Sequence, residues 1–283
     1  MKTSEKQVIA KKLASYCEMK GSQNKAAATL EGVSSATISQ ILNGNWELIS
    51  DEMWRSISVQ IGCTSTGVVV KTRGYDKIYK TMKDGQENAI VFGIIGNEGS
   101  GKTETIESYG SINRNVFHLK CAVYWNRRFF VSELCRLIGI NPSSSSVPGM
   151  MRDIVSAIKK MESPQIVIDE ADKLSDPLLY FFISLYNDLE DYCSIIVAGT
   201  PYLEARIKKG VERNTKGFRE IFSRLGRKFI YVPLPDEEDI IKVCKANGIT
   251  DFEIITKIIE DSDHDLRRVD RKIHAEKKRL KIN

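Results

Sequence analysis

The chain has 283 residues, enough to bury a sizeable core and to form two domains or one domain with an appendage. Its 42% hydrophobic and 28% charged residues are typical of a soluble globular protein, and the net charge of +5 favours a polyanionic partner. No apolar run approaches the ~20 residues of a membrane span, and residues 1–6 lack the apolar core of a signal peptide, so we expect a cytoplasmic protein without membrane contact. The scattered cysteines contain no C-x-x-C pair, which predicts reduced thiols and no metal site made of cysteine.

Residues 1–61 are predicted to form a small helical domain. Apolar side chains recur at helical spacing in a first helix, and two further helices are expected at 22–30 and 34–44. Gly32 permits a sharp turn between these two, and Ser34 caps the second. The pattern is that of a helix-turn-helix, and it resembles the DNA-binding domains of phage repressors. A helical module that docks on protein without touching DNA is the alternative.

In the phage-repressor class, the second helix of the pair enters the major groove of DNA. The resemblance therefore implies a surface with Gln23 and Lys25 near phosphates and with four residues toward base edges: Ser35, Ala36, Thr37 and Gln40. Only Gln40 has the bidentate reach that discriminates one base from another, so we expect weak sequence preference.

A small, polar, turn-prone stretch follows this domain and predicts a linker, which we place at 62–72. An amphipathic helix is expected next, at about 73–84, because its apolar residues return at helical spacing. The apolar, β-branched stretch 89–95 then predicts a buried strand.

Residues 96–103 form a complete G-x-x-x-x-G-K-T phosphate-binding loop between that strand and a helix that opens at Glu104. Backbone N–H groups of such a loop hold the β- and γ-phosphates of ATP, Lys102 adds a point charge, and Thr103 offers a hydroxyl to Mg²⁺. A chance glycine-rich turn is the alternative, which the flanking strand and helix argue against. The residues assigned to nucleotide binding here are Gly96, Asn97, Glu98, Gly99, Ser100, Gly101, Lys102, Thr103 and Thr105.

Past the loop, a second strand is expected at 115–121. The segment 123–130 then interleaves aromatic residues with Arg127 and Arg128, which on a DNA-binding ATPase could reach backbone phosphates. Equally, the aromatic side chains could belong to the core, with solvated arginines between them. Arg152, expected at the start of a later helix, is a further candidate for DNA contact.

A third buried strand delivers Asp169 and Glu170 at its carboxyl end, the edge at which open α/β sheets bind ligands. Asp169 is suited to the Mg²⁺ shell, and Glu170 is suited to take a proton from the attacking water. Residues 169–172 also spell a helicase box, but too little chain remains for the second lobe of a helicase. A fourth strand, at 193–199, ends at Thr200, whose hydroxyl could sense the γ-phosphate or orient water.

Basic residues gather in the last part of the chain. Five arginines lie between 206 and 227, before a final strand expected at 228–233. The last fifty residues are predicted to be helical. Residues 266–281 contain eight basic residues and only two acidic ones, Asp270 and Glu276. A solvated helix face is the ordinary interpretation of such a run, and a phosphate-binding surface on DNA is the alternative.

The order of these motifs resembles that of AAA+ ATPases over roughly residues 70–283. The resemblance implies an α/β fold: a P-loop AAA+ parallel sheet with helices on both faces and a small helical lid, preceded by the all-α helix-turn-helix domain. We place the ATPase core at 73–234 and the lid with its basic tail at 235–283.

The same resemblance implies roles for single residues. Thr200 matches the first sensor, Arg267 matches the second sensor, and Arg224 matches an arginine finger, with Arg219 and Arg227 as alternatives. A finger that lies away from its own phosphate loop must be donated by a neighbouring copy, so subunits would stack head to tail into rings or filaments.

A repressor-like domain joined to a compact AAA+ module is similar to the ATPases of the Mu B transposition protein type, which select targets for transposons. That resemblance implies an ATPase that uses Mg²⁺, oligomerises on double-stranded DNA and delivers target DNA to a transposase. Hydrolysis would remove the γ-phosphate, loosen the subunit interface and release the DNA. Two alternatives remain: a nucleotide-gated transcriptional regulator, and a replication initiator or loader ATPase.

Overall fold

The structure is a computed structural model that describes residues 1, 3–62 and 69–280. The predicted linker at 62–72 falls largely outside the described residues, as do Cys63 and Lys281. The described chain divides into two compact units. The first unit contains the described residues of 1–66 with 110–117 and 127–162, and the second contains 69–109, 118–126 and 163–280.

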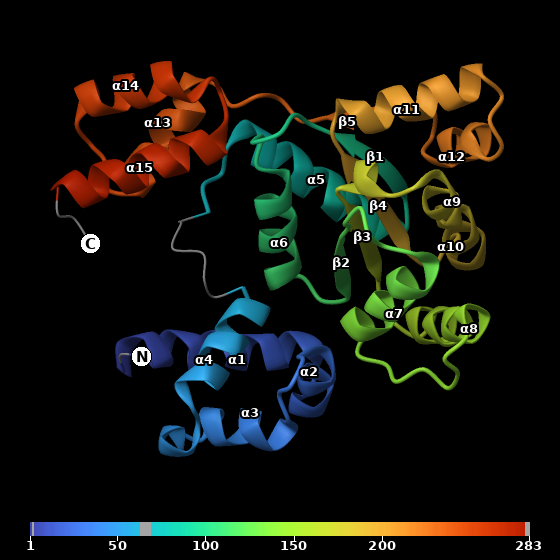
Figure 1. The fold of residues 1–283 in the computed structure, drawn as a ribbon, viewed down its shortest axis with the longest axis horizontal. Coiled ribbons are helices and arrows are strands. Elements are labelled where there is room, and N and C mark those ends of the chain that lie inside the picture. Colours follow the sequence, from blue (N-terminus) through green and yellow to red (C-terminus); the bar gives the residue numbers. More distant parts are fainter. Residues whose placement is uncertain (2, 63–68, 281–283) are drawn as a thin grey trace. The chain divides into compact units, whose positions relative to one another are not determined.

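The N-terminal part of the first unit is all helical (Figure 1). Its elements are α1 (Thr3–Lys20), α2 (Gln23–Thr29), α3 (Ser35–Leu42), the 3₁₀ turn η1 (Trp46–Leu48) and α4 (Asp51–Gln60). Serine side chains accept hydrogen bonds from backbone N–H groups at the starts of α2, α3 and α4. The helices enclose one apolar core that includes Leu13, Ile38, Ile41, Trp54 and Ile57. The structure thus has helices where the sequence predicts the pair, and their role in DNA binding stays a prediction.

Two further helices belong to the same unit: α7 (Arg127–Ile138) and α8 (Val147–Ile158), which pack against each other. Arg152 lies in the middle of α8 and not at its start, because Ser146 caps this helix earlier than expected. Near the end of α7, Arg136 donates to the carbonyl of Thr29 in α2 at 2.6 Å. This contact joins α7 to the N-terminal helices within the unit.

A five-stranded sheet has the strand order β2-β3-β4-β1-β5. Its strands are β1 (Val91–Ile95), β2 (Val116–Lys120), β3 (Gln165–Asp169), β4 (Ser194–Gly199) and β5 (Phe229–Tyr231). β1 pairs in parallel with β4 and β5, and β3 pairs in parallel with β4. Every residue of β3 and β4 is buried, so both faces of these central strands are covered. The carboxyl ends of parallel strands meet at one edge, where the site lies.

The remaining elements of the core are α5 (Arg73–Asn88), α6 (Lys102–Ile112), η2 (Ala171–Lys173), α9 (Asp176–Leu179), α10 (Phe181–Leu189), α11 (Pro201–Glu212) and α12 (Phe218–Arg224). Helices α5 and α11 both contact β1 and β4. A separate three-helix lid follows, formed by α13 (Glu237–Ala246), α14 (Phe252–Ser262) and α15 (Leu266–Leu280) around its own apolar core. The predicted α/β fold with a parallel sheet and a small helical lid is confirmed.

The five cysteines within the described ranges are free and buried. None of the helices formed by the described residues has both the length and the apolar character needed to cross a membrane.

Candidate nucleotide-binding site

The phosphate-binding loop connects the carboxyl end of β1 to the first turn of α6. Gly99 and Gly101 have φ angles of +72° and +82°, which residues with a Cβ atom rarely adopt. The Gly96 N–H donates to the last residue of β4 at 3.2 Å, and Ser100 Oγ donates to the carbonyl of Asn97 at 2.7 Å. These contacts fix a concave backbone at a helix N-terminus, a geometry that binds phosphate.

Lys102 lies over this loop. Its Nζ donates to the carbonyls of Gly96 and Asn97 at 2.7 and 2.9 Å. Burial lowers the pKa of Lys102, and nearby carboxylates oppose that change. Glu98 at the loop tip is exposed, whereas Thr105 is buried and donates its hydroxyl to the carbonyl of the last loop glycine at 2.8 Å. The loop therefore holds its lysine in place through its own backbone.

Thr103 and Asp169 bring two side-chain oxygen atoms together. Thr103 Oγ1 donates to Asp169 Oδ2 at 2.8 Å, and Asp169 is fully buried at the end of β3. His118 Nε2 lies 3.2 Å from the same oxygen, and the Glu170 N–H donates to Oδ1 at 2.8 Å. Burial alone would raise the pKa of Asp169, but these hydrogen bonds outweigh it and lower the pKa. A hydroxyl beside a charged carboxylate is a donor set that fits Mg²⁺.

Glu170 and Thr200 lie at the carboxyl ends of the neighbouring strands β3 and β4. Glu170 has a left-handed φ of +55°, and its carboxylate forms an ion pair with Lys173. Thr200 is half-buried at the start of α11, and its N–H donates to Asp172 Oδ1 at 3.2 Å. Because β3, β4 and β1 are adjacent and parallel, these residues share one sheet edge with the phosphate loop.

The lid reaches the same loop through the start of α15. The Leu266 N–H donates to the Gly99 carbonyl at 2.9 Å, and the Asp265 carboxylate lies directly against Gly99. Arg267 follows, with its N–H donating to Asp265 Oδ1 at 2.8 Å and its exposed side chain near enough for its charge to act on Lys102. The conformation of the loop and the position of the lid are therefore coupled.

Replacing Gly99 by alanine is expected to separate lid and loop. A Cβ atom there would lie 1.9 Å from Asp265 Oδ1, and the φ of +72° adds backbone strain of roughly 1–3 kcal/mol. We expect a lower thermal midpoint and weaker ATP binding, measured by thermal unfolding with and without Mg-ATP. Gly110→Ala is the matched control, because that glycine is helical and its added Cβ would meet only Val116 at 3.6 Å. Equal behaviour of the two variants would contradict the coupling.

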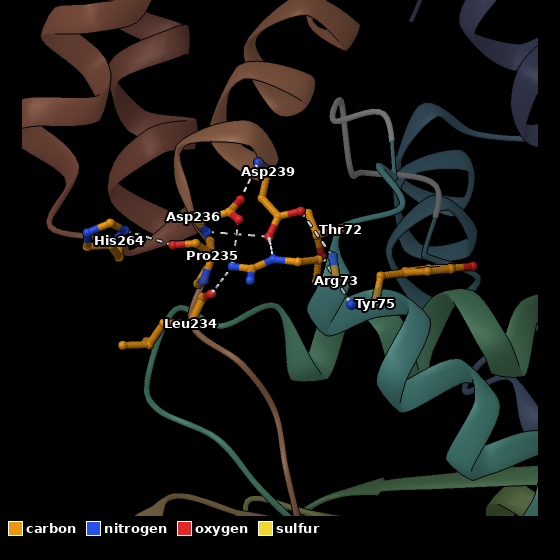
Figure 2. Close-up of polar contacts among 8 residues, drawn as sticks. All are labelled: Thr72, Arg73, Tyr75, Leu234, Pro235, Asp236, Asp239 and His264. Atoms are coloured by element: carbon orange, nitrogen blue, oxygen red, sulfur yellow. Dashed lines mark hydrogen bonds and ion pairs between the residues drawn. The ribbon is translucent and has the colours of Figure 1, made fainter.

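Arg73 ties α5 to the start of the lid (Figure 2). Its backbone N–H and Nε donate to the Asp239 carboxylate at 3.0 and 3.2 Å, and its Nη2 lies 3.0 Å from Asp236 Oδ2. The Asp239 side chain is only 1% exposed, so Arg73 compensates a charge that would otherwise be costly to bury. In the same segment between core and lid, His264 Nδ1 contacts the Pro235 carbonyl at 2.7 Å. A charge network thus holds the connection between core and lid.

A sequence profile of the AAA domain family matches residues 86–207. Relatives include the ATP-dependent target DNA activator B of Escherichia phage D108 and that of Escherichia phage Mu. Each is 23% identical over 251 residues, which cover 83% of this chain and 77% of the relative. The chain is an ATPase with an AAA domain, and it is similar to these two target DNA activators.

A solved structure supports the fold of this ATPase. Cdc6p from Pyrobaculum aerophilum matches 65% of the chain with a TM-score of 0.51 and 15% sequence identity. The match spans about half of that protein, 51% of its chain. The likeness concerns the fold alone.

In the ATPase, Arg224 lies away from the phosphate loop. Its guanidinium donates to Asn187 Oδ1 at 3.1 and 2.7 Å and lies 5.1 Å from the centre of the Tyr186 ring. Arg224 lines a hollow together with Val91, the first residue of β1. The phosphate loop begins after Ile95, the last residue of the same strand. The length of β1, roughly 16 Å, separates this hollow from the phosphate loop. Arg224 is therefore too far away to reach a nucleotide in its own loop.

The other predicted contact residues lie at the surface of the ATPase. Arg219 and Arg227 are exposed. Of the residues assigned to DNA, the exposed ones are Gln23, Lys25, Ala36, Arg127, Arg128 and Arg152, and the partly exposed ones are Ser35, Thr37 and Gln40. All nine belong to the first unit, and their contact with DNA stays a prediction.

Three residues that complete the site were not assigned roles from the sequence: His118, Asp172 and Asp265. Two of them stand inside motifs that were recognised, since Asp172 closes the Asp-Glu-Ala-Asp stretch and Asp265 opens the Asp-Leu-Arg stretch. His118 is a polar residue among the apolar residues of β2, the strand next to β3. This break in the apolar pattern is the one sequence signal that could have indicated a role for His118.

Proposed function

We propose that this ATPase assembles on double-stranded DNA with little sequence preference and delivers target DNA to a transposase. The observation that carries the proposal is the likeness to two ATP-dependent target DNA activators over 77% of their length. The nucleotide site supports it, because an ATP-dependent activator needs a pocket whose occupancy can change the rest of the chain.

In the proposed reaction, Lys102 and the loop N–H groups bind the β- and γ-phosphates of ATP, and Thr103 and Asp169 hold Mg²⁺. Bound Mg²⁺ would neutralise the negative charge that develops on the phosphates. Glu170 accepts a proton from the attacking water, and Thr200 orients that water or senses the γ-phosphate.

A neighbouring copy completes this site in our proposal. Arg224 is the assigned arginine finger, since it is held firmly but too far from its own loop, and Arg219 and Arg227 are the alternatives. Arg267 contacts the nucleotide from the lid. A finger given by one copy to the next makes a heterologous contact, which generates a head-to-tail ring or helical filament. Loss of the γ-phosphate on hydrolysis then loosens the contact.

DNA contact is proposed for two parts of the chain. Residues 1–61 are proposed as a helix-turn-helix domain, joined by a linker at 62–72 to the core at 73–234 and the lid with its basic tail at 235–283. Arg127, Arg128 and Arg152 would add contacts to backbone phosphates, so each subunit contributes a few charges and assembly depends strongly on salt. The proposed location of the protein is the cytoplasm.

Electron microscopy of the protein with random-sequence duplex DNA tests the proposal. With Mg-ATP, the parent chain and Glu170→Gln are expected to coat the duplex, and Glu170→Gln more persistently. Lys102→Ala is expected not to coat it, because the loop loses its charge contact with the phosphates. Coating by Lys102→Ala would refute nucleotide control, and a discrete footprint on one sequence would point to a transcriptional regulator instead.

A further inference from the structure

A cavity of about 290 Å³ lies within the first unit, whereas the phosphate loop belongs to the second unit. Residues of α1, α2, α8 and the segment after α7 line it, and Phe117 of β2 forms part of its apolar wall. Its polar lining consists of Lys20, Lys25, Lys160, Asn113 and Asn115. We call it the lysine cavity, because its described lining contains three lysines and no acidic residue. Its size approaches that of ordinary small-ligand sites.

Lys20 is the most deeply placed of the three ammonium groups. Its Nζ donates to the carbonyl of Leu137 at 3.1 Å and lies 5.5 and 5.7 Å from the ring centres of Tyr16 and Phe117. Burial, with a smaller effect of Arg136, lowers the pKa of Lys20 to about 8. An ammonium has three N–H donors, and the Leu137 carbonyl satisfies one of them.

The charge of the lysine cavity is not balanced locally. Among the described residues, no carboxylate lies within ion-pair distance of Lys20, Lys25 or Lys160. Arg136 near the same cavity shows the contrast, because Glu133 pairs with its guanidinium at 2.6 Å. Three lysines, two carboxamides and an aromatic ring line this one cavity, and such groups suit an anion that carries an apolar or planar group.

We propose that the lysine cavity binds a phosphate ester, with the phosphate between the ammonium groups and the organic part against Phe117. The ester is either a phosphodiester of duplex DNA or a free nucleotide. In the first case the inference deepens the proposed function and rests on it. In the second case it is a nucleotide site additional to the phosphate loop.

Labelling with pyridoxal 5′-phosphate tests the proposal on the full chain without ATP. This reagent carries a phosphate and an aromatic aldehyde, which forms an imine with an unprotonated lysine; borohydride then fixes the label. Mass spectrometry reads each lysine separately, so labelling of Lys102 does not interfere. We expect Lys20 to be labelled roughly tenfold faster than the exposed Lys159, because its pKa is lower and the phosphate is bound beside it.

Pyridoxal, which lacks the phosphate, separates phosphate binding from the reactivity of the amine. The double variant Lys25→Met/Lys160→Met is expected to lower the ratio of the two labelling rates at Lys20 roughly tenfold, as loss of two charge-assisted contacts predicts. Lys159→Met is the matched control for charge, and it should leave the ratio unchanged. Both lysines of the double variant are exposed, so the fold is expected to persist.

Competitors identify the source of the ester. Protection of Lys20 by random-sequence duplex, but not by AMP, assigns the cavity to the DNA backbone; protection by AMP assigns it to a free nucleotide. The proposal is overturned if pyridoxal labels Lys20 as fast as its phosphate does, or if neither competitor slows the labelling. Because ATP is absent, failure here leaves the ATP-dependent assembly on DNA untouched, and failure of that assembly leaves this result standing.

Discussion

Replacing Glu170 by glutamine is expected to lower the rate of ATP hydrolysis roughly 10²- to 10⁴-fold while ATP remains bound, because an amide cannot accept the proton of the attacking water. The change should leave the fold intact. It removes the partly exposed ion pair with Lys173, and such pairs contribute at most about 1 kcal/mol. Phosphate release measures turnover, and binding of a fluorescent ATP analogue measures occupancy.

Lys173→Gln is the matched control for this experiment, since it breaks the same ion pair and keeps the carboxylate of Glu170. We expect its turnover to stay within a few-fold of the parent protein. Lys102→Ala, in contrast, should lose ATP binding itself. The substitution removes the ammonium group of Lys102, which the carbonyls of Gly96 and Asn97 hold over the phosphate loop. Parent-like hydrolysis by Glu170→Gln would show that another group activates the water.

The sequence predicts the parts of the site that depend on local chemistry. The phosphate loop needs glycine at positive φ and a lysine and threonine at fixed spacing, so Gly99, Gly101, Lys102 and Thr103 are visible in one stretch. Asp169 is visible for the same reason, as the polar end of a buried strand. Both features can be recognised without knowing which strands are neighbours.

The contacts that the sequence does not predict come from distant parts of the chain. His118 reaches Asp169 because β2 lies next to β3, and strand order depends on crossovers that local patterns do not encode. Asp265 meets Gly99 because the whole lid folds back on the loop. The pairing of Arg73 with Asp239 spans the entire core in the same way. Long-range docking of this kind follows from packing, which periodicity and motif spacing leave open.

The arginine finger gives the second large expected effect. Arg224→Ala alone should lower turnover roughly 10³- to 10⁵-fold, the usual contribution of such a residue to phosphoryl transfer. The loss should affect hydrolysis more than ATP binding, because Arg224 lies at the amino end of β1 and does not reach its own loop. Its substitution also removes the ion pair with Glu220, at 2.8 Å, and thermal unfolding checks that the fold survives.

Mixing two inactive variants tests whether the finger acts between copies. Arg224→Ala keeps an intact pocket, and Glu170→Gln keeps an intact finger, so a copy of the first beside a copy of the second forms one complete site. In an equimolar mixture with random order, about a quarter of the interfaces have this arrangement, and we expect DNA-stimulated hydrolysis to recover to a comparable fraction. Arg219→Ala and Arg227→Ala, mixed in the same way, decide between the three arginines, since only the finger variant needs rescue. A mixture no more active than the sum of its two components would mean that each chain completes its own site. Hydrolysis would then not require head-to-tail assembly.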